Sequence, residues 1–267
     1  MTQQHRLASI LFIFAAAALP LMAQENWCTD HGWHSNDMVS HSEVREQHLA
    51  VATENVVNPE QNGSIRVHGW ANSDILVKAC VQASAHDSGT AESLAKQVTV
   101  TDGPGRVVAK GPTAQNESWW SVSYEIWVPA SANLELHAHN GSIHVEGTLG
   151  QIRAHAVNGS VKLKDVSGDV EGETTNGSLT IELASGQAAW QGKGLKLKTV
   201  NGSIDLDLPA NFGAEVEVST VNGRVKSEFP TGLDPKEHHD VRFTLGAGGP
   251  KIEAQTVNGS VHIGRQS

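Results

Sequence analysis

Asn-Gly pairs recur seven times along the 267-residue chain and are its most frequent motif with chemical potential. Six of them continue into Ser and match the acceptor pattern for N-glycosylation, as does the Asn-Glu-Ser at 116–118. Six glycans on one type of turn would crowd one another, so we expect most of these sites to stay unmodified. The alternative is that Asn-Gly-Ser is a structural corner, which recurs because the chain is built from repeats.

Histidines are the second chemically suggestive group, with 14 in the chain. His137 and His139 would share one face of a strand, and His155 stands three residues before its own Asn, as His137 does. We therefore expect His137 and His155 to stack on neighbouring repeats. A zinc site needs three or four converging ligands, and the sequence indicates no Cys or carboxylate at ligand spacing. The prediction is a polar outer face without metal or cofactor, and a His-based metal-binding protein is the alternative.

Catalytic patterns are weak. The sequence has no Gly-x-Ser-x-Gly elbow, no glycine-rich phosphate loop and no calcium-binding nonapeptide repeat. Carboxylates expected on outer faces, such as Glu146, Glu171 and Asp205, are spread along the strands without a convergent pair. The sequence therefore predicts a non-enzyme with a solubilising acidic surface. The alternative is a polysaccharide-acting β-helix enzyme, which would require such a carboxylate pair.

Trp119 and Trp120 are adjacent, so in a strand one side chain would face the core and the other would face outward. An outward tryptophan could stack on a sugar ring or anchor a protein partner, which makes the pair a candidate for surface binding. The competing interpretation, which we favour, is that the two rings cover an open end of a repeat fold, because such folds need caps.

The Asn-Gly pairs mark a repeat of roughly 18–25 residues in the middle of the chain, with longer insertions at both ends. After each Asn, the third and fifth residues are mostly apolar and the fourth is polar, as in Ile143, His144 and Val145. Before each Asn, the apolar residues stand at even offsets, as in Leu134 and Leu136. This alternation predicts two half-buried strands that meet at Asn-Gly and face a common core. The corners predicted to form a structural turn ladder are Asn140, Gly141, Asn158, Gly159, Asn176, Gly177, Asn201, Gly202, Asn222, Gly223, Asn258 and Gly259.

Two architectures fit this pattern. One is an antiparallel β-meander or sandwich, in which each Asn-Gly closes a tight hairpin with positive φ at both positions. The other is a β-solenoid, in which equivalent corners stack about 4.8 Å apart. We favour the solenoid, because Asn tolerates left-handed backbone and its amide can bond to the copy above, so stacked corners gain from being alike. The predicted fold class is all-β, a β-solenoid with an irregular N-terminal cap and one short helix within 86–97.

The domain organisation follows from composition. Residues 1–23 combine Arg6 with an apolar run that ends on Ala23, which predicts a secretory signal peptide. Residues 24–52 mix Trp, His and polar residues without a period and are predicted to be irregular, and residues 53–267 form the solenoid. No second apolar run is long enough to cross a bilayer. We therefore expect an exported protein, either periplasmic or extracellular.

Cys28 and Cys80 are the two cysteines, and an exported chain with an even count favours a disulfide between them. Two separate buried thiols are the alternative. The formal net charge of −10 argues against nucleic acid as a partner, because phosphate backbones select basic surfaces.

Three stretches stand in a characteristic order: "NGSIRVHGWANSDILVKACV", "VTVTDGPGRVVAK" and "VSYEIWVPASANLELHAHNGS", followed by serial Asn-Gly corners. In this order they resemble the bacterial putative-adhesin domain family of the cell envelope, over residues 62–263. The resemblance implies a β-solenoid, export, and a structural or binding role, with no catalytic residues to carry over. We therefore expect an exported, non-catalytic, envelope-associated binding or scaffolding protein of adhesin type. Its partner would be a protein or glycan of the envelope.

Overall fold

The computed structural model describes residues 28, 38–113, 118–184, 192–230 and 240–266. Regular structure in these ranges is almost entirely β-strand, with one helix, α1 (Ser88–Gln97), which confirms the helix expected within 86–97. The predicted signal peptide lies outside the described residues. None of the helical structure in the described ranges is long and apolar enough to cross a membrane.

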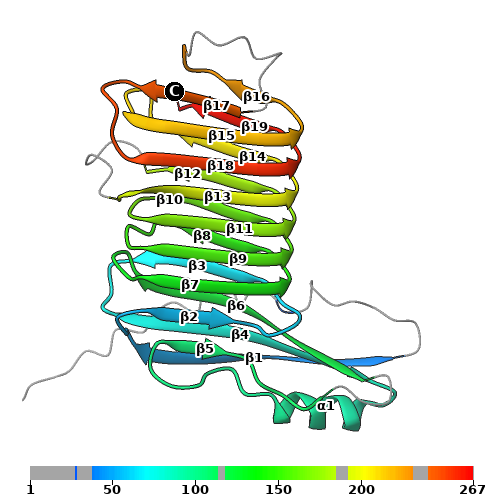
Figure 1. Ribbon diagram of the computed structural model, residues 1–267. Helices are drawn as coiled ribbons and strands as arrows, with labels where there is room; N and C mark the ends of the chain where they lie inside the picture. Colours follow the sequence, from blue (N-terminus) through cyan, green and yellow to red (C-terminus); the bar gives the residue numbers. More distant parts are fainter. Residues whose placement is uncertain (1–27, 29–37, 114–117, 185–191, 231–239, 267) are drawn as a thin grey trace, which may run out of the picture.

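The strands form two sheets that face each other across one core (Figure 1). Sheet A contains, in spatial order, β1 (Val39–Ala50), β4 (Asp74–Ala85), β6 (Trp119–Pro129), β3 (Ile65–Trp70), β8 (Ile143–Glu146), β10 (Val161–Val166), β12 (Leu179–Leu183), β14 (Ile204–Leu208), β19 (Val261–Arg265) and β16 (Val225–Ser227). Sheet B contains β17 (Asp240–Leu245), β15 (Ala214–Asn222), β18 (Lys251–Asn258), β13 (Gly194–Asn201), β11 (Val170–Asn176), β9 (Ile152–Asn158), β7 (Leu134–Asn140), β2 (Asn55–Asn58) and β5 (Arg106–Val108).

Each coil consists of a sheet B strand, an Asn-Gly corner and a sheet A strand, and neighbouring coils pair in parallel. The β-solenoid prediction is therefore confirmed. The hairpin alternative is wrong, because the two strands that flank a corner belong to different sheets and pair with other coils. The predicted inward residues are buried, with Leu134, Leu136, Ile143 and Val145 all at most 1% exposed. Alternation with period two thus places one apolar row from each sheet in the shared core.

The coils do not stack in the order of the sequence at the C-terminal end. β18 pairs with β13 on one side and with β15 on the other. The red strand β18 accordingly lies between the earlier strands β13 and β15 in Figure 1. The coil of β15 and β16 is therefore outermost, although it comes earlier in the sequence. The last coil in the sequence, β18 and β19, lies between it and the coil of β13 and β14. Antiparallel β17 covers the sheet B edge of that outermost coil.

Asparagine side chains form a continuous hydrogen-bonded ladder along the corners. Each amide nitrogen donates to the amide oxygen of the preceding coil, for example from Asn158 Nδ2 to Asn140 Oδ1 at 2.9 Å. The ladder runs in the order Asn62, Asn140, Asn158, Asn176, Asn201, Asn258 and Asn222. The serines add a second set of bonds, in which the backbone N–H of Ser160 donates to Ser142 Oγ at 3.3 Å. Because the corners are alike, every amide in the middle of the ladder has a partner on both sides.

Glycine is needed at these corners for close approach. Among the described corner glycines only Gly63 has a positive φ, and no corner Asn has one. The expectation of left-handed backbone at Asn is therefore wrong. A Cβ atom on Gly159 would instead lie 2.0 Å from the carbonyl oxygen of Gly141 in the next coil. Only a residue without a side chain allows the coils to stack at this distance.

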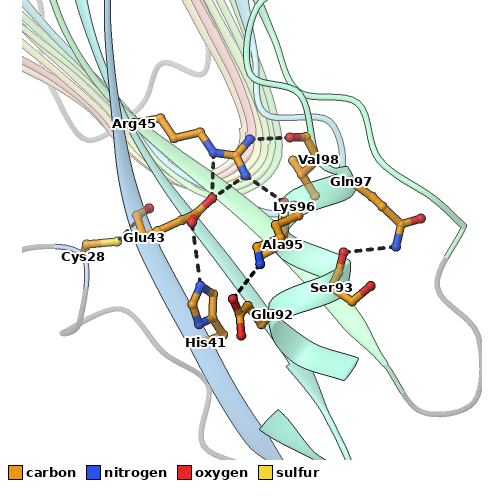
Figure 2. Close-up of polar contacts among 10 residues, drawn as sticks. All are labelled: Cys28, His41, Glu43, Arg45, Glu92, Ser93, Ala95, Lys96, Gln97 and Val98. Atoms are coloured by element: carbon orange, nitrogen blue, oxygen red, sulfur yellow. Dashed lines mark hydrogen bonds and ion pairs between the residues drawn. The ribbon is translucent and has the colours of Figure 1, made fainter. Parts of the chain in front are cut away.

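Helix α1 covers the N-terminal end of the solenoid, where it packs against β1 and β4. Its residues Leu94 and Ala95 join the core. Figure 2 shows Arg45 of β1 between Glu43 and the last carbonyl groups of α1. Arg45 Nη2 donates to the carbonyl oxygen of Ala95 at 2.8 Å, and Nη1 donates to that of Val98. A cation is favourable at a helix C-terminus, so Arg45 stabilises the contact between α1 and strand β1.

The prediction of an irregular segment over 24–52 is wrong in its second half, because Val39–Ala50 form β1, antiparallel to β4. The sequence does not show the alternation of apolar and polar residues that indicates a strand, because the half-buried residues of β1 are mostly polar, including His41, Glu43 and Arg45. They are polar because they face the carbonyl end of α1 and one another. The cap is therefore α1 with β1. Residues 24–27 and 29–37 lie outside the described residues.

Cys28 and Cys80 form the predicted disulfide, with Cα atoms 5.2 Å apart, and the alternative of two separate thiols is wrong. Cys80 lies in β4, on the outer face of sheet A, so the bond fixes Cys28 against that strand. The carbonyl oxygen of Cys28 also accepts a hydrogen bond of 2.7 Å from Gln82 Nε2. These contacts hold the beginning of the described chain at the capped end of the solenoid.

Candidate functional site

The corner ladder leaves one donor group open at its N-terminal end. Asn62 Oδ1 accepts from Asn140 Nδ2 at 3.0 Å, but no described residue accepts a hydrogen bond from Asn62 Nδ2. The other ladder amides, from Asn140 onward, each donate to the preceding coil. The ladder is therefore a structural element whose first amide still has hydrogen-bonding capacity.

Asn62 lines a groove of about 480 Å³ that also contains both candidate tryptophans. The remaining lining residues come from the turn before β3 and from the segment between β5 and β6: Glu60, Gln61, Lys110, Gly111, Pro112 and Thr113. We call this site the Trp119–Trp120 groove. It combines aromatic rings with amide, carboxylate and ammonium groups, which is the composition of a site for a polar ligand with apolar faces.

Trp120 is held rigidly by its surroundings. It packs against the core, and its Nε1 donates to the carbonyl oxygen of Pro112 at 2.9 Å. Gly111 lies so close to the ring that a Cβ atom there would be 2.6 Å from it. Trp120 thus packs against the core, and its covering of an open end of the solenoid stays a prediction.

Trp119 begins β6 beside Ser84 of β4 and has the opposite parity to the buried Val122 and Tyr124. It therefore lies on the outer face and is half-buried. The pair divides as expected from alternation, since Trp120 packs inward and Trp119 offers a ring to the groove.

Two charged residues give the groove its polarity. Lys110 Nζ lies 2.8 Å from Asp102 Oδ2, and this ammonium group lowers the pKa of the Asp102 carboxyl. Glu60 stands at a positive φ of 66°, and its backbone N–H donates to Asn58 Oδ1 at 2.8 Å. The exposed Glu60 carboxylate is thus anchored through its backbone at the rim, where it can accept hydrogen bonds.

The histidines follow the predicted stacking. The rings of His137 and His155 lie parallel, with centroids 5.6 Å apart. Each histidine also has a carboxylate partner, since Glu135 Oε1 lies 2.8 Å from His137 Nε2 and Glu173 Oε2 lies 3.5 Å from His155 Nδ1. Within the described residues no group of three or more His, Cys, Asp or Glu side chains could hold a metal ion.

Outward carboxylates are neutralised by cross-strand cations. Lys196 Nζ lies 2.7 Å from Glu171 Oε1, and Lys164 Nζ lies 3.1 Å from Glu146 Oε1. These hydrogen bonds lower the pKa of both carboxyl groups. A glycoside-cleaving general acid requires a raised pKa. Among the described carboxyl groups, every resolved pKa shift is downward.

One aromatic cluster was missed from the sequence. Trp127 lies on the outer face of sheet A, where its ring stacks on His68 with centroids 5.3 Å apart. Lys78 Nζ lies 5.4 Å from the centroid of the same ring. The alternation of buried Tyr124, Ile126 and Val128 would have indicated this orientation.

Comparisons with known proteins place the whole solenoid in one family. The sequence profile described as Toastrack DUF4097 matches residues 50–264. No curated protein matches the chain. A solved putative cell adhesion protein from Clostridium sporogenes ATCC 15579 is similar at 11% identity and a TM-score of 0.44, over 85% of this chain and 100% of that one. A putative adhesin from Bacteroides fragilis NCTC 9343 is similar at 9% identity and a TM-score of 0.40, over 87% of this chain and 98% of that one.

Proposed function

The chain belongs to the Toastrack DUF4097 family, and from this premise we propose that it is an exported, non-catalytic binding or scaffolding protein of adhesin type at the cell envelope. In this proposal the solenoid is a rigid support, and the Trp119–Trp120 groove is the ligand contact. The ligand is a glycan of the envelope, whose sugar rings have an apolar face and hydroxyl groups at the edge. A protein partner is the second candidate.

The open amide of Asn62 beside the two tryptophans carries the proposal. Asn62 Nδ2 can donate to a sugar hydroxyl, while the Glu60 carboxylate can accept from one. Trp119 offers a half-buried ring on which a sugar can stack. The amide is preorganised, because its oxygen is bonded to Asn140 and Asn140 is in turn bonded to Asn158. A preorganised donor spends little conformational entropy when the ligand binds.

Two further observations support the proposal. A disulfide persists in oxidising compartments, so the Cys28–Cys80 bond favours export. Downward pKa shifts keep the outward carboxylates of Glu146 and Glu171 ionised at neutral pH, which favours binding over acid–base catalysis at these positions.

The binding experiment screens the disulfide-bonded full chain against an array of neutral oligosaccharides. Trp119→Ala removes the stacking ring. Asn62→Asp keeps an acceptor oxygen for Asn140 and replaces the open donor with an anionic acceptor oxygen. Leu149→Ala is the matched control, because Leu149 is 53% exposed and lies outside the groove. We expect both groove variants to lose about tenfold or more in affinity, from one lost stacking or hydrogen-bonding contact, and the control to bind normally.

Four results would reject parts of this proposal. Binding that survives both groove variants would place the ligand elsewhere, and no binding to any glycan would favour the protein partner. Release of reducing sugars from envelope polysaccharide by the purified protein would establish catalysis. Cell fractionation that finds the protein in the cytoplasm with reduced cysteines would contradict export.

A further inference from the structure

Three cationic or proton-binding side chains lie side by side on the outer face of sheet A. Arg66, His144 and Lys162 occupy equivalent positions on β3, β8 and β10. Neighbouring strands are about 4.8 Å apart, so the three side chains form a row across the strands. We call them the Arg66–His144–Lys162 row.

Acidic side chains near the row are engaged elsewhere. Glu125, the cross-strand neighbour of Arg66, lies 3.2 Å from His68 Nε2, and Glu146 lies 3.1 Å from Lys164 Nζ. Arg66 and Lys162 are exposed, and neither forms an ion pair with any described residue. Arg66 and Lys162 therefore carry positive charge without a direct ion pair, although the carboxylates of Glu125 and Glu146 lie beside the row, in a chain of net charge −10.

His144 completes the row with an unsatisfied group. Its Nε2 is shielded from solvent and has no hydrogen-bond partner among the described residues. Burial is the main cause of its lowered pKa, followed by the charges of Arg66 and Lys162. The groups that face it are Arg66 and His68 on β3, Glu146 on β8, and Lys162 on β10. An anion placed across the row would reverse the effect of the two cations and favour protonated His144.

An aromatic platform adjoins the row. His68 lies two residues beyond Arg66 on the same face of β3, about 7 Å away, and its ring stacks on Trp127. Lys78 adds a further cation over the indole ring. Aromatic rings beside cations suit sugar rings that carry anionic substituents, because the ring stacks on one face while the charge is paired at the edge.

We propose that this surface binds an acidic polysaccharide, a chain of sugars bearing carboxylate or sulfate groups, which runs along the Arg66–His144–Lys162 row. A single chain suits the surface better than an anionic bilayer does. The same face becomes acidic beyond β10, with Glu182, Asp205 and Asp207, and would be repelled by a broad negative plane. The surface is distinct from the Trp119–Trp120 groove, since Trp119 and Glu125 are six residues or about 20 Å apart along β6.

The test measures binding of the disulfide-bonded full chain to polygalacturonate, heparin and neutral dextran by calorimetry at two salt concentrations. The doubly substituted Arg66→Gln/Lys162→Gln chain removes the charge of the row. Lys226→Gln is the control, because Lys226 lies in the same register at the far end of sheet A, beyond β14. We expect wild type and control to bind the acidic polymers in a salt-dependent manner, and the double variant to bind at least about tenfold more weakly from loss of two charge contacts.

A nuclear magnetic resonance titration of His144 gives a second readout, and polygalacturonate should raise its pKa. Trp119→Ala should leave binding to the acidic polymers unchanged, so failure of the proposed groove and failure of this site are distinguishable. The proposal is overturned if dextran binds equally well, if the double variant binds as the wild type does, or if no acidic polymer binds. Binding to phosphatidylglycerol vesicles without binding to either polymer would also overturn it.

Discussion

Gly159 packs so closely on Gly141 that a Cβ atom on the former would lie 2.0 Å from the carbonyl oxygen of the latter. The same contact recurs along the corner, with 1.9 Å between a Cβ on Gly202 and the oxygen of Gly177. Contacts of this length are incompatible with any side chain. The recurrence of Asn-Gly therefore reflects the distance between coils, while the asparagine supplies the hydrogen bonds that hold the coils in register.

Gly159→Ala should destabilise the protein by about 2 kcal/mol or more, because the methyl group must push two backbones apart in a closely packed stack. Gly172→Ala is the matched control in a neighbouring strand. A Cβ there would meet Leu197 Cδ2 at an ordinary 3.4 Å, so little change is expected. Urea unfolding followed by circular dichroism measures both. Equal stability of the two variants would show that the coils can separate without cost.

Asn158→Ala should cost more stability than Asn222→Ala. Asn158 donates to Asn140 and accepts from Asn176, whereas Asn222 stands at the end of the ladder and only donates to Asn258. At about 1 kcal/mol for each hydrogen bond, we expect a loss near 2 kcal/mol for the interior position and half of that at the end. Asn72→Ala, in an exposed turn, controls for the substitution itself. A larger loss at the end than in the interior would contradict the ladder as a source of stability.

Arg45→Met should loosen α1 before it affects the solenoid. The substitution keeps an apolar stem but deletes the donors to the carbonyl groups of Ala95 and Val98. It also removes the hydrogen bond that lowers the pKa of Glu43. Hydrogen exchange should accelerate in Ser88–Gln97. The free energy that protects these amides should fall by about 1–3 kcal/mol, which is the range for hydrogen bonds to a charged group. Arg224→Met, at the far end, should leave α1 protected, and unchanged exchange in the Arg45 variant would rule out this role.

His144 gives the stability a defined dependence on pH. Because its pKa is lowered in the folded state, the unfolded chain binds this proton more readily. The contribution of His144 to stability is therefore fully present above the ordinary pKa of about 6.5 and is lost as the pH falls below it. His144→Gln should reduce the stability lost between pH 7.5 and 5.5. Arg66→Gln should raise the pKa of His144, and titration of His144 above its ordinary value in wild type would refute the assignment.

Much of the architecture was predictable because its signals are local and repeated. Alternation at Ile143, His144 and Val145 assigns each side chain to the core or the outer face without knowledge of its partner strand. The disulfide was predictable from two cysteines in a chain that its first 23 residues predict to be exported. Strand β1 was not predictable, because its inward residues Glu43 and Arg45 are charged, and Arg45 finds its remaining hydrogen-bond acceptors, the carbonyl groups of Ala95 and Val98, only when α1 docks on the strand.

The candidate sites depended on the tertiary structure to a greater degree. Sequence alternation separated Trp119 from Trp120, but the groove exists only because the turn at Glu60 and the segment at Pro112 meet beside them. Alignment on the corners placed Arg66, His144 and Lys162 at one offset. Only the side-chain geometry shows that the acidic neighbours of this row, Glu125 and Glu146, contact His68 and Lys164.

The sequence by itself determined that this chain forms coils with an inner face, an outer face and an Asn-Gly corner on each level. The tertiary structure alone decided the order of the coils, in which β18 enters between β13 and β15. The physical reason is that all corners offer nearly the same amide, glycine and hydroxyl contacts, so any coil can stack on any other. Contacts away from the corners, such as the antiparallel pairing of β17 with β15, then distinguish coils that are equivalent at their corners.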